Sequence, residues 1–190
     1  MSTSAKLRAL FARCVRELER LDADWAVGGA FAMAAHGYTR ETRDIDLFIG
    51  DDAREPLLAA LRAHGVAVDE VVEDIHYAAI PDRRDPEARI DLLFPSSEPD
   101  VSAMMTARPA LVLKKKVPVW PLHLMVANKL MSGRDKDALD LAELRKRGLI
   151  DAGRVLEALR EMREPAAIKR LQRLMDARAP RYLRGRGSPY

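Results

Sequence analysis

The sequence predicts a mixed α/β (α+β) protein, in which a mixed β-sheet flanked by helices is followed by a C-terminal helical bundle. Two patterns support this class. Before about residue 120, segments with hydrophobic residues at helical spacing alternate with short strand-like segments, whereas all later segments have helical spacing. We therefore expect a first domain at residues 1–120, a helical region at 121–178 and a basic, mobile tail at 179–190.

Each expected element has a local signal. Ser4 suits the N-cap of a first helix, Gly28 and Gly29 end the first strand, and Pro121 suits the first turn of a helix. Before residue 120 we expect helices at 4–21, 30–37 and 51–65, and strands at 25–27, 43–49, 66–72, 76–80, 88–94 and within 110–120. After it we expect helices at 121–131, 135–147, 151–163 and 165–178.

Composition narrows the class of protein. The chain has 190 residues, of which 48% are hydrophobic and 32% charged, and this balance is typical of a folded globular protein. No apolar run approaches the roughly 20 residues of a membrane span, and no signal-peptide pattern is present. Because Cys14 is the single cysteine, an internal disulfide is excluded and a cytoplasmic location is expected. We interpret Cys14 as a core residue of the first helix.

The net charge of +3 is unevenly distributed. Residues 160–190 contain nine Lys or Arg and three acids, so this segment carries +6 and the remainder −3. A basic end on a near-neutral body favours a polyanionic partner. The alternative is a solvated helix face followed by a frayed tail.

The Gly28-Gly29 pair stands between an expected strand and an expected helix. Small residues at such a turn let a phosphate approach the first N–H groups of the helix. The pair lacks the spacing of a dinucleotide fingerprint, and no Gly-Lys-Ser/Thr of a P-loop follows it. Taken alone, such a pair between a strand and a helix is mostly a packing or turn feature.

Two acids occupy one face of the strand RDIDLFI at 43–49. Since side chains alternate along a strand, Asp44 and Asp46 point to the same side, and two such carboxylates can hold a hard divalent cation. The segment RIDLLF at 89–94 has the same texture and contains Asp91. If the two strands are neighbours, three carboxylates converge, as two-metal phosphoryl or nucleotidyl transfer requires.

The segment VGGAFAMAAHGYTRETRDIDLF, at 27–48, resembles the signature of the polymerase-β-like nucleotidyltransferase superfamily. That signature is a hydrophobic residue, Gly-Gly or Gly-Ser, a helix, Asp-hydrophobic-Asp, and a third acid on a later strand. The resemblance implies that Asp44, Asp46 and Asp91 are catalytic residues that bind two Mg²⁺ ions. It also implies that Gly28 and Gly29 hold the phosphates of a nucleoside triphosphate, ATP for example. Many relatives have Ser where this chain has Gly29, so a serine contact is absent.

A second block, NKLMSGRDKDALDLAEL, follows at 128–144. It resembles the motif after the catalytic domain of abortive-infection-type (AbiEii-like) toxin nucleotidyltransferases and their small uncharacterised relatives. The resemblance implies that Lys129 and Arg134 contact the nucleotide phosphates and that Asp140, with Asp137 as a further candidate, orients them. The alternative is ordinary helix pairing, for instance of Lys136 with Asp140.

Other polar residues yield weaker hypotheses. Arg40 and Thr42 precede the acidic strand and are candidates for contact with a nucleotide or acceptor. The four histidines show no metal-ligand spacing, and we interpret them as structural.

These patterns together predict a Mg²⁺-dependent enzyme that transfers a nucleoside monophosphate from an NTP to a hydroxyl group. The resemblance favours an RNA acceptor, such as a tRNA 3′ end, and the toxin of a type IV toxin–antitoxin pair with a cognate antitoxin as partner. A protein hydroxyl or a small antibiotic-like alcohol are alternative acceptors. A non-catalytic antitoxin or RNA-binding module on the same fold is the alternative to an enzyme.

Overall fold

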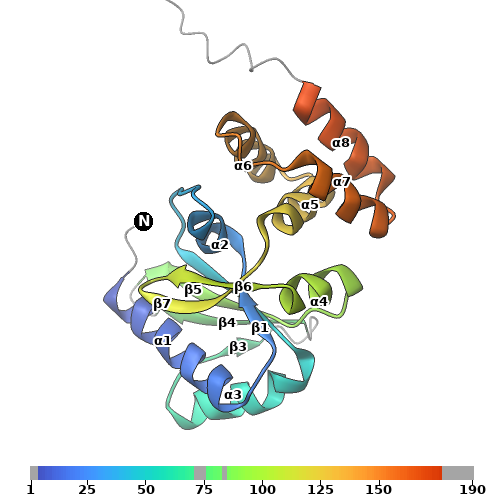
Figure 1. Ribbon diagram of the computed structural model, residues 1–190. Coiled ribbons are helices and arrows are strands. Elements are labelled where there is room, and N and C mark those ends of the chain that lie inside the picture. Colours follow the sequence, from blue (N-terminus) through green and yellow to red (C-terminus); the bar gives the residue numbers. More distant parts are fainter. Residues whose placement is uncertain (1–3, 71–75, 83–84, 177–190) are drawn as a thin grey trace, which may run out of the picture. The chain divides into compact units, whose positions relative to one another are not determined.

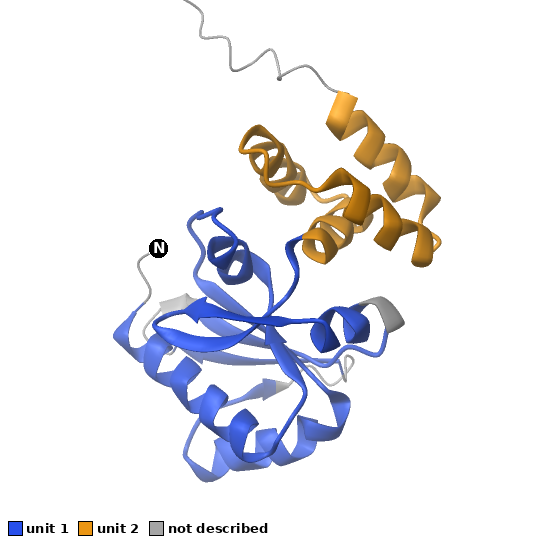
Figure 2. Cartoon of the chain, in the orientation of Figure 1, with its two compact units in different colours: residues 1–122 blue, residues 123–190 orange. Residues whose placement is uncertain are grey.

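The computed structural model describes residues 4–70, 76–82 and 85–176 (Figure 1). The chain divides into two compact units, residues 1–122 and residues 123–190 (Figure 2). The mobile tail predicted at 179–190 lies outside the described residues, as does part of the strand predicted at 66–72. The predicted mixed α/β class is confirmed, because the first unit is a sheet with helices and the described part of the second is helical.

The first unit follows the predicted order with one addition. Its elements are α1 (Ala5–Arg20), β1 (Trp25–Val27), α2 (Gly29–Ala35), β2 (Asp44–Ile49), the 3₁₀ turn η1 (Asp51–Ala53), α3 (Arg54–Ala63), β3 (Asp69–Glu70), β4 (Tyr77–Asp82), β5 (Asp85–Leu93), α4 (Glu98–Met105), β6 (Arg108–Val112) and β7 (Lys115–Val119). The addition is α4, which the hydrophobic pattern did not predict. Its start nevertheless has two ordinary signals, Ser97 at the N-cap and a proline in the first turn.

The seven strands of the described residues form one mixed sheet in the order β3-β4-β5-β2-β1-β7-β6. The β2–β5 and β1–β7 pairs are parallel, and the other neighbours are antiparallel. Strands β2 and β5 are therefore adjacent although 35 residues of chain, 50–84, lie between them. This crossover sets the two acid-bearing segments side by side.

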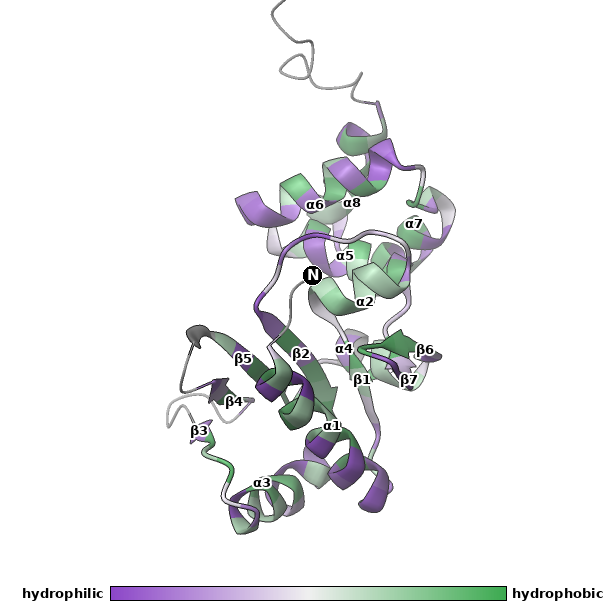
Figure 3. Cartoon of the chain, turned by 90° about the vertical axis from the view of Figure 1, so that its left-hand side faces the viewer, coloured by the Kyte–Doolittle hydropathy of each residue, from purple (hydrophilic) through white to green (hydrophobic). Residues whose placement is uncertain are grey.

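At β2, the core lies under one face of the sheet. On β2, Ile45, Leu47 and Ile49 are fully buried, whereas the alternate residues are only half-buried. Helix α1 contacts both α3 and β5, and Figure 3 shows the alternation of hydrophilic and hydrophobic residues along it. As predicted, Ser4 caps α1 by accepting the Leu7 N–H at 3.0 Å.

Cys14 is a core residue, as predicted. Its side chain is fully buried in α1, and burial raises the pKa of the thiol to about 12. Thiolates are the reactive form of cysteine, so Cys14 is inert at neutral pH.

The second unit contains four described helices, α5 (Leu122–Ser132), α6 (Asp135–Lys146), α7 (Ala152–Glu161) and α8 (Pro165–Asp176). α7 and α8 pack against each other, and α6 contacts α8. Arg170 of α8 donates to the carbonyls of Leu130 and Met131, at 2.6 and 3.0 Å, and so satisfies the C-terminal end of α5. Throughout the described residues, helices long and apolar enough to cross a membrane are absent.

Candidate active site

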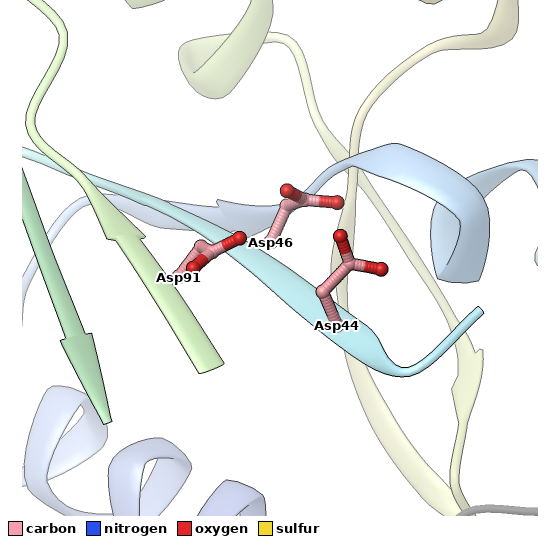
Figure 4. A group of neighbouring side chains, drawn as sticks. All are labelled: Asp44, Asp46 and Asp91. Atoms are coloured by element: carbon pink, nitrogen blue, oxygen red, sulfur yellow. The ribbon is translucent and has the colours of Figure 1, made fainter. Parts of the chain in front are cut away.

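Three carboxylates meet on the sheet face opposite the α1 side. Asp44 and Asp46 stand on β2, and Asp91 of β5 is the direct parallel partner of Asp46. One oxygen of each lies within 4.8 Å of the others, and Figure 4 shows the three side chains together on the two strands. Asp91 is buried, with 6% of its surface exposed, while Asp44 and Asp46 are half-buried. The sequence predicted that the three carboxylates converge if the two strands are neighbours, and the structure shows that they are.

Neighbouring donors orient two of these carboxylates. Asp44 accepts a hydrogen bond from the Thr42 hydroxyl. Oδ1 of Asp91 accepts from the Tyr77 hydroxyl at 2.7 Å and from Arg89 Nε at 2.6 Å, so these two bonds leave Oδ2 for another ligand. Burial and the hydrogen bond to Asp91 raise the pKa of Tyr77 to about 12, and the same carboxylate raises the pKa of Arg89. Tyr77 therefore remains a donor at neutral pH.

Sequence reasoning missed both Tyr77 and Arg89. Arg89 could have been found, because it lies two residues before Asp91 and so projects from the same strand face. Tyr77 could not, since it reaches Asp91 only through the antiparallel pairing of β4 with β5.

The Gly28-Gly29 turn touches the acidic strand directly. The Gly28 N–H donates to the backbone oxygen of Asp46 at 3.0 Å. Gly29 has a positive φ of 55°, and a Cβ placed there would lie 1.7 Å from Asp46 Oδ2. A side chain at this position would therefore require the Asp46 carboxylate to move.

An aromatic pair stands next to the same turn. A Cβ at Gly28 would lie 2.4 Å from the Phe48 ring, and Phe48 packs against Trp120 with ring centroids 4.0 Å apart and the ring planes tilted by 35°. Trp120 is itself positioned by its backbone, whose N–H donates to the Val27 carbonyl at 3.0 Å. Both glycines are therefore required for close approach.

The residues present fit a divalent metal. Carboxylate oxygens are the ligands that Mg²⁺ prefers in proteins. At 4.8 Å each pair of negative charges repels by about 3 kcal/mol with an effective dielectric constant of about 20. Among the described residues this is the one group of three or more potential metal ligands, and a divalent cation would remove the repulsion.

The predicted phosphate contacts of the second block form a separate cluster in the second unit. Lys129 Nζ donates to Asp137 Oδ1 at 2.6 Å and to Asp140 Oδ2 at 2.7 Å. Asp137 also accepts from Ser132 and, at 2.7 Å, from Arg134 Nε. Asp137 and Asp140 are buried, so the two acids hold the lysine ammonium in one place. The resemblance implied that Asp140 orients Lys129, and the two side chains are hydrogen-bonded. Contact of Lys129 with a nucleotide stays a prediction.

The mixed sheet, the Gly-Gly turn, two acids on one strand and a third on its parallel neighbour together form the arrangement that the resemblance to nucleotidyltransferases implied. The model of the aminoglycoside-2''-adenylyltransferase family matches residues 10–107, slightly more than half of the chain. The chain belongs to this family and is therefore an enzyme of the nucleotidyltransferase class. A search of curated proteins found no match.

Solved structures agree with this fold. The chain is similar to a nucleotidyltransferase structure from Thermotoga maritima, with a TM-score of 0.50, 17% identity, and coverage of 77% of this chain and 96% of that one. The chain is also similar to a nucleotidyltransferase-like protein from Paracoccidioides brasiliensis, with a TM-score of 0.53, 16% identity, and coverage of 90% of this chain and 94% of that one. For ANT(2")-Ia in complex with adenylyl-2"-tobramycin, the TM-score is 0.52 and the identity 14%, with coverage of 90% of this chain and 97% of that one. At these identities the similarity is one of fold.

Proposed function

We propose that this enzyme transfers a nucleoside monophosphate from an NTP to an acceptor hydroxyl, with two Mg²⁺ ions held by Asp44, Asp46 and Asp91. The observation that carries the proposal is the convergence of these carboxylates within 4.8 Å beside the Gly28-Gly29 turn. Because Gly29 lies against the Asp46 carboxylate, a triphosphate resting on the turn would have its α-phosphate near the acids. Bound Mg²⁺ would neutralise the triphosphate and the charge that develops in the transition state.

The chain's own groups perform the remaining tasks. The acceptor oxygen forms a bond to the α-phosphorus, the bond from that phosphorus to the pyrophosphate oxygen breaks, and Asp91 receives the hydroxyl proton. Tyr77 and Arg89 donate to Asp91 Oδ1 and so fix the orientation of the carboxylate, which leaves Oδ2 to accept the proton. From the second block's resemblance, we propose that Lys129 and Arg134 contact nucleotide phosphates, with Asp140 orienting Lys129. Residues 1–120 are then the catalytic domain and 121–178 the helical region that assists it.

The first candidate acceptor is a hydroxyl group of an aminoglycoside-like antibiotic. Membership of the aminoglycoside-2''-adenylyltransferase family favours it, and ATP is then the expected nucleotide. The family match includes β2, β5 and the Gly28-Gly29 turn, that is, all three carboxylates and the proposed phosphate site.

The second candidate acceptor is RNA, such as a tRNA 3′ end, which would make the enzyme the toxin of a type IV pair. Two observations favour it. The block at 128–144 resembles that of the AbiEii-like toxins, and residues 160–190 carry a net charge of +6, which suits a polyanion. A cognate antitoxin would be the partner protein in this case.

One experiment tests both the reaction and the acceptor. The purified chain is incubated with Mg²⁺ and each α-labelled NTP, with either a panel of aminoglycosides or total tRNA as acceptor. We expect label to pass to one of the two pools, and Asp46→Asn or Asp91→Asn to lower the rate at least about 1,000-fold, since each removes a charge that acts on the transition state.

Asp51→Asn is the matched control, because Asp51 is an exposed acid just beyond the end of β2. It should retain the wild-type rate, and circular dichroism should show that all variants are folded. Transfer at an unchanged rate in both Asp46→Asn and Asp91→Asn would overturn the proposed site. A protein hydroxyl becomes the acceptor of interest if label enters neither pool but enters protein in a cell extract.

A further inference from the structure

One residue of the first unit contacts both ends of the segment that carries the Gly-Gly turn. The Trp120 N–H donates to the carbonyl of Val27 at 3.0 Å, and Val27 directly precedes the turn. The Trp120 carbonyl lies 2.7 Å from Nε2 of His36, which directly follows α2. Since a carbonyl can only accept, His36 Nε2 carries the proton and donates it. The backbone of Trp120 thus spans residues 28–36, that is, the turn and α2 together.

Helix α2 depends on tertiary contacts for its orientation. It has seven residues, about two turns, and isolated helices of this length are unstable in water. Its N-cap residue, Gly28, supplies no side-chain hydrogen bond, and glycine leaves the backbone of a turn flexible. Packing of the buried Phe31 and Met33 holds the flank of α2. The hydrogen bond from His36 to Trp120 adds a fixed point at its C-terminal end.

The Trp120 ring extends these contacts to the acidic strand. It packs against Phe48, which lies directly beside Gly28 and projects from the same face of β2 as Asp46, two residues earlier. Trp120 is 3% exposed, and its indole N–H has no hydrogen-bond acceptor in the described chain. The ring therefore contributes packing, while the backbone supplies the polar contacts. We call this set of residues the Trp120 bridge: Trp120, Val27, His36 and Phe48.

We propose that His36 is a positioning residue for nucleotide binding, which acts through Trp120 on the Gly28-Gly29 turn. This inference rests on the proposed function, in which the turn holds the phosphates of the NTP. The turn lies against the acids, because the Gly28 N–H donates to the Asp46 backbone oxygen and Gly29 lies against the Asp46 carboxylate. The Trp120 bridge keeps it there.

The role of His36 predicts which kinetic constant depends on it. Phosphates that rest on the turn contact it both before and during transfer, so a loosened turn weakens the ground state and the transition state equally. Loss of such uniform binding raises KM for the NTP and leaves kcat unchanged. The acids themselves stay on their strands, since their positions are set by the pairing of β2 with β5.

The test measures steady-state transfer by the full chain, with the α-labelled NTP that the wild type transfers fastest. His36→Leu removes the donor, and we expect KM for the NTP to rise at least about 5-fold, as loss of one hydrogen bond would give, with kcat within about twofold of wild type. The Kd of the same NTP with Mg²⁺ and without acceptor, from titration calorimetry, should rise by the same factor. Because the Gln amide can place an N–H near the position of His Nε2, His36→Gln should bring KM back to within about twofold of wild type.

His64→Leu is the matched control. His64 is the C-cap of α3, as His36 is of α2, and in both cases a glycine with a positive φ follows. The partner of His64 is Glu17, at 3.3 Å, which lies outside the Trp120 bridge. Both leucine variants lose one tertiary contact, so thermal unfolding should show a lower stability in both. Only His36→Leu should change KM.

Three results would overturn the inference while the proposed function stands: a wild-type KM in His36→Leu, an equal rise of KM in His64→Leu, or a KM that stays raised in His36→Gln. A wild-type chain that neither binds nor transfers any NTP would overturn the proposed function and this inference together. Circular dichroism shows whether each variant is folded. If His36→Leu does not fold, His36→Asn takes its place with the same expected rise in KM, because its shorter amide does not reach the Trp120 carbonyl.

Discussion

The two charged clusters of this enzyme are built on opposite principles. In the first unit, Asp44, Asp46 and Asp91 gather three like charges within 4.8 Å on one sheet face. In the second unit, Asp137 and Asp140 gather around an ammonium group, with Lys129 Nζ 2.6 and 2.7 Å from their oxygens. The first arrangement sets three acids against one another, although Arg89 also lies 2.6 Å from Asp91, whereas in the second a lysine lies between two acids.

This difference indicates which cluster is the better candidate for a metal site. In the second unit, Lys129 and Arg134 balance the charges of Asp137 and Asp140, so the desolvation cost of these acids is offset within the protein. Carboxylates placed against one another cost stability, a cost that is offset when a metal binds. The proposed metal site is therefore the triad. Lys129 uses two of its three N–H donors on Asp137 and Asp140, so one donor remains for a phosphate.

Apart from substitution of the acids themselves, the largest expected effect on activity comes from Gly29→Ser, which introduces the residue that many relatives have at this position. Its side chain would start 1.7 Å from Asp46 Oδ2 and would turn that carboxylate away from the triad. We expect nucleotide transfer to fall at least about 100-fold, since a misplaced metal ligand loses transition-state stabilisation. Labelled-NTP transfer measures the effect.

Gly65→Ala is the control for backbone strain. Gly65 has a similar positive φ of 70°, but a Cβ there would meet nothing within 4 Å. Its variant should lose about 1 kcal/mol of stability and keep full activity. If Gly29→Ser were as active as Gly65→Ala, the contact between the turn and Asp46 would have no role in the reaction.

The next largest effect is expected on stability. Lys129→Met leaves Asp137 and Asp140 buried without their shared ammonium, and we expect a loss of about 3–5 kcal/mol in the free energy of unfolding. Urea denaturation monitored by circular dichroism checks this. Adding Asp137→Asn and Asp140→Asn to that variant should recover part of the loss, and no recovery would mean that packing, not charge, holds the cluster together.

Acid should disturb the second cluster through Asp137. Burial opposes ionisation of this carboxyl, but hydrogen bonds from Lys129, Ser132 and Arg134 prevail and lower its pKa to about 2, below the usual 3.8. A depressed pKa contributes stability above about pH 4, and this contribution, about 2 kcal/mol, is lost as pH falls toward 2.

Urea unfolding of the helical unit between pH 5 and pH 2 measures this loss. Asp135→Asn is the control, because Asp135 is an exposed acid in the same first turn of α6. It should show the wild-type pH dependence, whereas Asp137→Asn should flatten it. The same pH dependence in all three proteins would show that Asp137 is not the responsible group.

The smallest effect should have the opposite sign. Asp46→Asn removes one of three like charges, so in the absence of metal we expect it to raise the stability of the first unit by about 1 kcal/mol while abolishing transfer. Thermal unfolding in EDTA and in Mg²⁺ measures this. Mg²⁺ should stabilise the wild type more than the variant, and a variant destabilised in EDTA would contradict the description of the triad as mutually repelling.

Much of this fold could be predicted because its signals are local. Ser4 at the start of α1 and the alternation along β2 are set by neighbouring residues, so the sequence showed both. Helix α4 escaped prediction because its eight residues have no marked hydrophobic face, so only its start carried a signal. The roles of Arg40 and of the tail at 179–190 stay predictions.

The sequence by itself determined that Asp44 and Asp46 share one face of a strand, because alternation along a strand needs no partner. It also determined the Gly-Gly turn ahead of them. Only the tertiary structure decided that Asp91 stands beside Asp46, that Tyr77 and Arg89 hold it, and that Asp46 fills the space next to Gly29. The physical reason is register: a shift of one residue between β2 and β5 would have turned Asp91 into the core, and only the packing of the whole sheet excludes that shift.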